Sequence, residues 1–121
     1  MKQITQITAQ SRQKMILTTE DGKEITFSLT YRPTQRSWYF DLVYSDFTFY
    51  GCKLVNSLNI LRRYRKIIPF GISCRSIGGI DPFMIDDFSR ERSVLFLLTK
   101  TEVENLEKQV YLSEIENNTD D

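Results

Sequence analysis

The chain has 121 residues, a hydrophobic share of 40%, a charged share of 26% and a formal net charge of zero. This length suits one domain with one core, the two shares are typical of globular proteins that fold in water, and no apolar run approaches the roughly 18 residues of a membrane-spanning helix. Because the sequence contains no histidine and only 2 cysteines, it excludes Ser-His and Cys-His nucleophile pairs and argues against a zinc site within one chain.

The N-terminal residues 1–14, MKQITQITAQSRQK, lack the apolar stretch of a secretory signal peptide, so we expect synthesis in the cytoplasm. In that compartment Cys52 and Cys74 are expected to be buried, reduced thiols, and a disulfide between them is the less favoured alternative. With so few metal-binding side chains, we expect no cofactor.

Residues 14–31, KMILTTEDGKEITFSLTY, predict a β-hairpin. Asp21-Gly22 supplies the positive φ angles of a tight turn between two runs rich in Ile, Thr, Leu and Phe. In the second run, large side chains alternate with Thr and Ser, which is the two-residue period of a strand with one buried face.

A second hairpin is predicted after the turn at Pro33. Trp38, Phe40, Leu42 and Tyr44 alternate at period two, Ser45-Asp46 forms a short turn, and the alternation resumes at Phe47. Seven aromatic residues lie between Trp38 and Tyr50. An aromatic stripe at strand spacing is typical of a core, or of a sheet face docked on a partner, more than of a ligand platform.

The second half of the body predicts two further strands. Between Val55 and Arg65 a helical turn is possible, and the residue before Pro69 is biased away from helix. "PFGISCRS" then predicts a strand with Ile72 and Cys74 on one face. An irregular loop at residues 77–91 follows, and the apolar run Ser93–Thr99 fits a strand that is buried on both faces.

The C-terminal part predicts a helix and an acidic tail. Thr101 and Glu104 match a capping box, and apolar residues at helical spacing then favour a helix over about residues 101–112. We therefore divide the chain into one β-rich domain, residues 1–112, and an acidic, disordered tail, residues 113–121.

Residues 1–100 carry 15 cations and 9 anions, a net charge of +6, whereas residues 101–121 carry 1 cation and 7 anions, a net charge of −6. Such a tail could be a solvated end, shield its own body, or dock on another copy or another basic protein.

Together these elements predict a mainly β fold. We expect an antiparallel β-barrel or sandwich of about six or seven strands, closed by a short C-terminal α-helix.

Two charged groups could carry function. Asp81, Asp86 and Asp87 offer oxygen ligands for Mg²⁺ or Ca²⁺ and paired carboxylates for acid–base chemistry, but their spacing matches no calcium loop, and Gly78-Gly79 alone makes no phosphate cradle. The alternative, which we favour, is that they cap turns or pair with arginines, for which the candidates are Arg62, Arg63, Arg90 and Arg92.

The second group is the basic stretch NILRRYRKIIPFG, residues 59–71, in which four cations surround Tyr64. Such a stretch can neutralise phosphates and stack a base, so a small nucleic-acid-binding module using Arg62, Arg63, Arg65 and Lys66 is one hypothesis. The chain has a pI near 6.3 and no nucleic-acid-binding motif. We therefore favour pairing of these arginines with carboxylates of this chain or of a neighbour.

The order of residues resembles a family of small phage tail proteins, the baseplate plug proteins of contractile-tailed phages. The resemblance spans roughly residues 13–106 and departs from the family pattern at Ser57 and at residues 89–91. It is carried by the following strings: Trp38-Tyr39-Phe40-Asp41, Gly51-Cys52-Lys53-Leu54-Val55, Leu58, Leu61, "RRYR" at 62–65, Pro69-Phe70-Gly71, Cys74, Ser76, Gly79, Asp81-Pro82, "DDF" at 86–88, Arg92 and "FLLT" at 96–99.

The resemblance implies a structural virion component of the tail baseplate, made in the host cytoplasm and without catalytic activity. Its expected partners are other baseplate, hub and tail-tube proteins and further copies in a homo-oligomeric ring, with neither a membrane nor a specific nucleic acid. In that setting the residues expected at protein interfaces are Arg62, Arg63, Tyr64, Arg65, Pro69, Phe70, Asp81, Asp86 and Asp87.

Overall fold

The computed structural model describes the backbone of residues 1–119 and the side chains of residues 1–109. Within this part of the chain there are seven strands, two short 3-10 helices and one α-helix. The strands are β1 (Lys2–Ile4), β2 (Arg12–Thr18), β3 (Glu24–Arg32), β4 (Ser37–Tyr44), β5 (Phe47–Lys53), β6 (Phe70–Ser76) and β7 (Ser93–Thr99). The helices are η1 (Arg62–Tyr64), η2 (Ile77–Gly79) and α1 (Lys100–Thr119).

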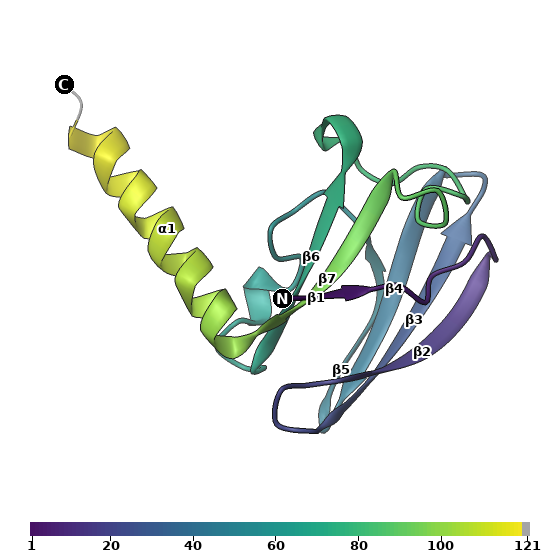
Figure 1. The fold of residues 1–121 in the computed structure, drawn as a ribbon, viewed down its shortest axis with the longest axis horizontal. Helices are drawn as coiled ribbons and strands as arrows, with labels where there is room; N and C mark the ends of the chain where they lie inside the picture. The colour runs from purple at the N-terminus through teal and green to yellow at the C-terminus, as the bar shows by residue number, and fades with distance from the viewer. Residues whose placement is uncertain (120–121) are drawn as a thin grey trace.

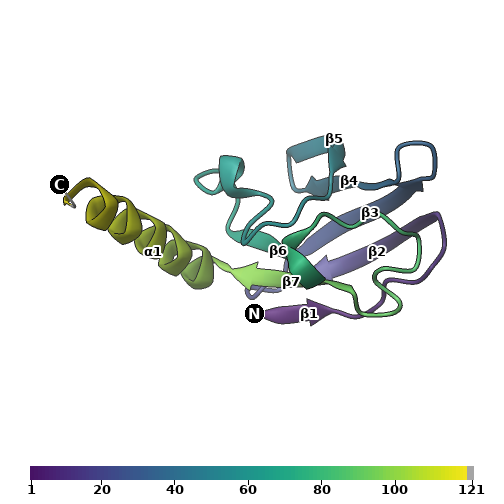
Figure 2. The same ribbon diagram turned by 90° about the horizontal axis from the view of Figure 1, so that it is seen from above.

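The strands form two antiparallel sheets that face each other (Figure 1). One sheet has the order β2-β3-β4-β5, and the other has the order β1-β7-β6. Seen from above, β1 and β7 lie on the side opposite β4 and β5, and α1 leaves the body at one edge (Figure 2). The predicted mainly β fold is confirmed as an open sandwich, because the sheets do not close into a barrel.

Both predicted hairpins are confirmed. Thr18 pairs with Glu24 across the first turn, where Gly22 has a φ of 85°. Tyr44 pairs with Phe47 across the second turn, where Ser45 has a φ of 52°. These positive φ angles are what a short turn between two twisted strands requires.

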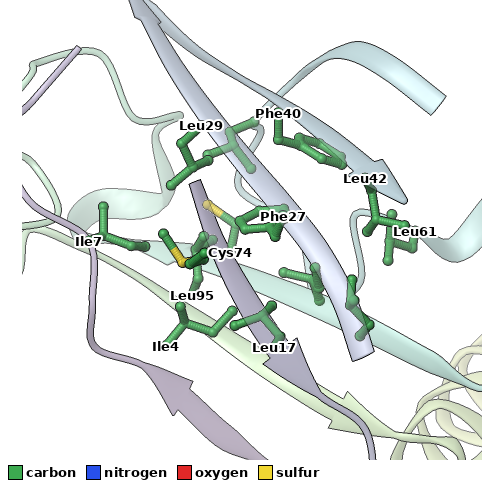
Figure 3. Close-up of a cluster of buried hydrophobic side chains, with 14 of the residues drawn as sticks. Ile4, Ile7, Leu17, Phe27, Leu29, Phe40, Leu42, Leu61, Cys74 and Leu95 are labelled. Carbon is green, nitrogen blue, oxygen red and sulfur yellow. The ribbon is translucent and has the colours of Figure 1, made fainter. Parts of the chain in front are cut away.

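The core lies between the sheets and is made of alternate residues from facing strands (Figure 3). Phe27 of the first sheet lies beside Cys74 and Leu95 of the second, Leu42 lies beside Leu61, and all five side chains have 0% exposure. Cys74 and the half-buried Cys52 are free thiols. Burial, with a smaller contribution from Asp81, raises the pKa of Cys74 to about 12, so this thiol stays protonated at neutral pH.

Two features of the second sheet differ from the predictions. Strand β1 was not predicted, and it pairs with β7 through Gln3 and Phe96. The prediction that β7 is buried on both faces is wrong, because Val94 and Phe96 are only half-buried. The outer face of β7 is covered in part by single side chains, such as the Arg75 guanidinium 5.6 Å from the Phe96 ring.

The start of α1 also differs from the prediction. The capping box uses Thr99 and Glu102: Thr99 N donates to Glu102 Oε1 at 3.1 Å, and Glu102 N donates to Thr99 Oγ1 at 3.2 Å. This box lies two residues before the predicted one, and the helix begins at Lys100 and projects away from the sheets (Figures 1 and 2). No helix among the described residues is both long and apolar enough to cross a bilayer. The helix is also longer than predicted, because it continues past residue 112 to Thr119. The division into a domain at residues 1–112 and an acidic, disordered tail at residues 113–121 stays a prediction, and residues 120–121 lie outside the described part of the chain.

The first turn of α1 packs closely against β6 at Gly71. A Cβ atom at this position would lie 2.8 Å from Asn59 Oδ1 and 2.9 Å from Val103 Cγ2. Asn59 is itself buried, and its Oδ1 accepts hydrogen bonds from Leu61 N and Ile72 N at 3.0 and 3.2 Å. Because the neighbours on both sides are held, only glycine fits between them.

We therefore expect Gly71→Ala to lower the free energy of unfolding by about 1–3 kcal/mol through overpacking. Urea denaturation followed by circular dichroism measures this loss. Gln109→Ala, at an exposed position of α1, is the control and should have little effect. A Gly71→Ala protein as stable as the wild type would show that α1 does not pack this closely on β6.

Candidate interaction surface

The loop that joins β6 to β7 is organised around one buried carboxylate. Asp87 is 2% exposed. Its Oδ2 accepts hydrogen bonds from Phe83 N and Met84 N, both at 2.8 Å, and its Oδ1 accepts one from Arg92 Nε at 2.8 Å. Its backbone carbonyl also accepts from Arg92 N and Ser93 N. Asp87 thus ties the loop to itself and to the start of β7.

The other two predicted carboxylates serve neighbouring parts of this loop. Asp86 pairs with Arg90 at 3.0 Å and also with Arg92. Asp81 Oδ1 accepts a hydrogen bond from Asn56 N at 2.8 Å. The predicted pairing with arginines therefore occurs, with Arg90 and Arg92 as the partners. Within the described residues, no three acidic or cysteine side chains are grouped closely enough to hold a metal ion.

The environment of Asp87 favours its charged form. Burial acts to raise the pKa of this carboxyl, but the hydrogen bonds from the Met84 amide, the Arg92 guanidinium and the Phe83 amide outweigh it and hold the pKa below the ordinary value of 3.8. The hydrogen bond to Asp87, opposed by partial burial and supported by Asp86, raises the pKa of Arg92. The pair is therefore charged across the physiological pH range.

Two aromatic side chains of the first sheet hold the loop through hydrogen bonds to its backbone. Trp38 Nε1 donates to the carbonyl of Met84 at 3.0 Å, and the Tyr31 hydroxyl donates to the carbonyl of Phe83 at 2.8 Å. The Trp38 ring also meets the Phe88 ring edge to face, with centroids 5.4 Å apart. The loop thus contacts the first sheet both through its backbone carbonyls and through the Phe88 side chain.

The loop held in this way presents large apolar side chains to solvent. We call residues 77–85 the apolar loop. Its exposed members are Ile77 (70%), Ile80 (54%), Met84 (46%), Phe83 (41%) and Ile85 (37%). Sequence reasoning missed this surface, although five large apolar residues in a segment rich in Gly, Pro and Asp were a visible signal. A contiguous exposed apolar patch on a globular protein is typical of an interaction site.

The basic stretch lies at the base of α1 and is partly neutralised by it. Arg62 Nε lies 2.8 Å from Glu107 Oε1, and Arg65 Nε lies 3.4 Å from Glu107 Oε2. The hydrogen bond from Arg62, opposed by partial burial, lowers the pKa of Glu107. Arg63 and Lys66 are exposed beside this pair. Part of the predicted pairing is therefore internal to the chain.

The aromatic residues of this stretch pack on the sandwich. The Tyr64 ring lies 5.0 Å from the rings of both Phe47 and Phe49. Phe70 is buried and meets Tyr44 edge to face at 5.1 Å, and Pro69 is half-buried. These contacts place each predicted interface residue in the fold, while their role at an interface stays a prediction.

Comparison with known proteins gives one family match. The family model described as "Cyanophage baseplate Pam3 plug gp18" matches residues 1–101. This range contains both sheets, the apolar loop and the basic stretch. No curated protein matches the chain.

Asp87→Asn tests the role of the buried carboxylate. An asparagine turns NH₂ hydrogens toward groups that are themselves donors, so we expect the free energy of unfolding at pH 7 to fall by about 2–4 kcal/mol. Because the folded-state pKa of Asp87 is lowered, its contribution is complete above the ordinary pKa of 3.8 and is lost as the pH falls through the folded value.

The stability difference between wild type and Asp87→Asn should therefore shrink on going from pH 7 toward pH 2, as measured by thermal unfolding at each pH. Glu20→Gln, at an exposed position, serves as the charge control. A difference that stays constant down to pH 2 would contradict the assignment of a stabilising, ionised Asp87.

Proposed function

The chain belongs to the cyanophage baseplate plug family, and on this premise we propose that it works as a structural component of a phage tail baseplate. In finer terms, we propose that it acts in a contractile tail as a plug, or as a connector between hub and tube end. It would do so through contacts with other baseplate proteins and with further copies of itself. The match over residues 1–101 is the observation that carries this proposal.

The exposed apolar loop supports a role in assembly. Large apolar side chains on a loop that is held by the buried Asp87 carboxylate and by Trp38 and Tyr31 lose little conformational freedom when a partner covers them. Such a surface is better suited to contact with another protein than to exposure to water.

Neither rival hypothesis gains support from the site. Glu107 takes up Arg62 and Arg65, so the basic stretch offers fewer phosphate contacts than its sequence suggests. Asp81, Asp86 and Asp87 each bind amides or arginines of the loop, and we propose no catalytic role for them.

The proposal is tested in assembled tails. We expect mass spectrometry to detect the protein in purified tails. Charge reversal with Arg63→Glu and Lys66→Glu should lower its incorporation at least tenfold, because these two cations are exposed and their reversal leaves the Arg62–Glu107 pair in place. Lys14→Glu with Lys23→Glu, at exposed positions, is the matched control. Absence of the wild-type protein from purified tails would overturn the proposal.

A further inference from the structure

Strand β2 is an unpaired edge of the first sheet. The sheet has the order β2-β3-β4-β5, so β2 pairs on one side only. Just after this strand, Thr19 N donates to Lys23 O at 2.8 Å. Because hydrogen-bonded and non-hydrogen-bonded positions alternate along an antiparallel ladder, the amides and carbonyls of Ile16 and Thr18 point away from β3. Among residues 1–109, no other backbone group bonds to them.

The sandwich is open beside this edge. Two adjoining hollows lie there, with volumes of about 410 Å³ and 200 Å³. Strands β1 and β2 provide most of the lining of the smaller hollow, and the larger one extends to the start of β6 and the end of β7. The residues that line both hollows are Lys2, Thr18 and Leu97. We call the two hollows together the edge groove.

The space beside β2 suits a single strand and excludes a second sandwich. A sheet that continues past β2 has its next strand about 4.8 Å farther out. Figure 2 shows that β1 lies farther out on this side than β2, so β1 of the other sheet faces that position. A second copy joined edge to edge would bring its own β1 to the same place, and the two β1 strands would collide. An isolated extended segment brings no second layer with it.

The backbone groups of the edge define the backbone of the occupant. Ile16 and Thr18 are exposed, and each offers one amide and one carbonyl at the spacing of a β-ladder. An extended chain carries donors and acceptors at the same spacing, so it can form four hydrogen bonds here without a change in β3. A helix satisfies its backbone groups internally and cannot form these bonds.

The walls of the edge groove define the side chains of the occupant. Alternate side chains of an added strand point between the sheets, where Leu97 and Phe70 give the groove apolar walls. Lys2 lines both hollows, and its exposed side chain has no ion pair within the described part of the chain. Glu20 lines only the larger hollow. A carboxylate is therefore complementary to the middle of the groove and is disfavoured at the Glu20 end.

From these observations we propose that an extended segment of a neighbouring baseplate protein adds to β2 as a fifth strand of the first sheet. The segment bonds to the outward amides and carbonyls of Ile16 and Thr18, places apolar side chains in the edge groove and sets a carboxylate beside Lys2. In strand addition of this kind, main-chain hydrogen bonds give affinity, and pockets for alternate side chains give specificity. This inference rests on the proposed function, since it describes how one neighbour in the baseplate is bound.

Hydrogen exchange measured by mass spectrometry on the full chain, free and in purified tails, tests the proposal. We expect the amides of Ile16 and Thr18 to exchange quickly in the free protein and at least about tenfold more slowly in tails, because a bonded amide exchanges only when its hydrogen bond opens. The amides of Met15 and Leu17 are the internal control. They lie in the β2–β3 ladder, where Leu17 occupies a bonded position two residues before Thr19, and should be protected in both states.

A pair of variants at one position provides a second test. Ile16→Pro removes an outward amide and no ladder bond, so it should fold and yet lower incorporation into tails by about tenfold, which corresponds to one lost hydrogen bond with its acceptor left unpaired. Ile16→Thr keeps the amide at this 56% exposed position and should incorporate normally. Lys14→Glu with Lys23→Glu changes residues that line neither hollow and should also incorporate normally. If Ile16→Pro fails to fold, the exchange measurement decides alone.

Three exchange results would overturn the proposal. The first is exchange of Ile16 and Thr18 that is as fast in tails as in the free protein. The others are protection of these amides in the concentrated free protein, or loss of their protection in tails on deletion of residues 110–121, since either would make a second copy the occupant. A protein that is absent from tails defeats the proposed function and this inference together, whereas a protein present in tails with a free β2 edge defeats this inference alone.

Discussion

The buried carboxylate of Asp87 is the constraint on which the candidate surface depends. It accepts two backbone amides and one guanidinium in a place where water does not reach it. A buried charge is tolerated only when its lone pairs are taken up in this way. Because the loop between β6 and β7 must keep these donors on Asp87, it adopts one conformation, and in this conformation Ile77 and Phe83 lie outside the core.

This arrangement explains why the large side chains of the apolar loop stay exposed although the protein has a hydrophobic core in which apolar residues are buried. Each one costs free energy in water, on the order of 25 cal/mol per Å² of apolar area. The cost is recovered only when a neighbour covers the surface. The base of α1 likewise has paired and exposed residues. Glu107 pairs with Arg62 and Arg65, whereas Arg63 and Lys66 are exposed.

Much of the sandwich could be predicted from sequence because its signals are local. Asp21-Gly22 demands a turn, and the period-two pattern from Trp38 to Tyr44 demands a strand with one buried face. Strand β1 could not be predicted, because its three residues are stabilised by pairing with β7, about 90 residues away in sequence. The capping box was placed two residues late because two overlapping Thr-x-x-Glu patterns occur, and the pairing of Thr99 with Phe70 decides between them.

The site was predictable in composition and not in arrangement. The spacing of Asp81, Asp86 and Asp87 indicates loop carboxylates that cap turns or pair with arginines. Asp86 and Asp87 have arginine partners, whereas Asp81 accepts a hydrogen bond from Asn56 N. Nothing in that spacing indicates that Asp87 is buried beneath the backbone of Phe83 and Met84. Exposure of the apolar loop was also hidden, because its side chains follow neither a helical nor a strand period. The loop is held by hydrogen bonds to Asp87, Trp38 and Tyr31, which are tertiary contacts or depend on the loop's own fold.

The most direct test of this account is a reconstruction of the assembled tail baseplate at side-chain resolution. The account predicts that residues 77–85 keep the conformation set by Asp87 and are covered by a neighbouring protein of the baseplate. A baseplate in which these residues face solvent, or in which the loop has left Asp87, would contradict it.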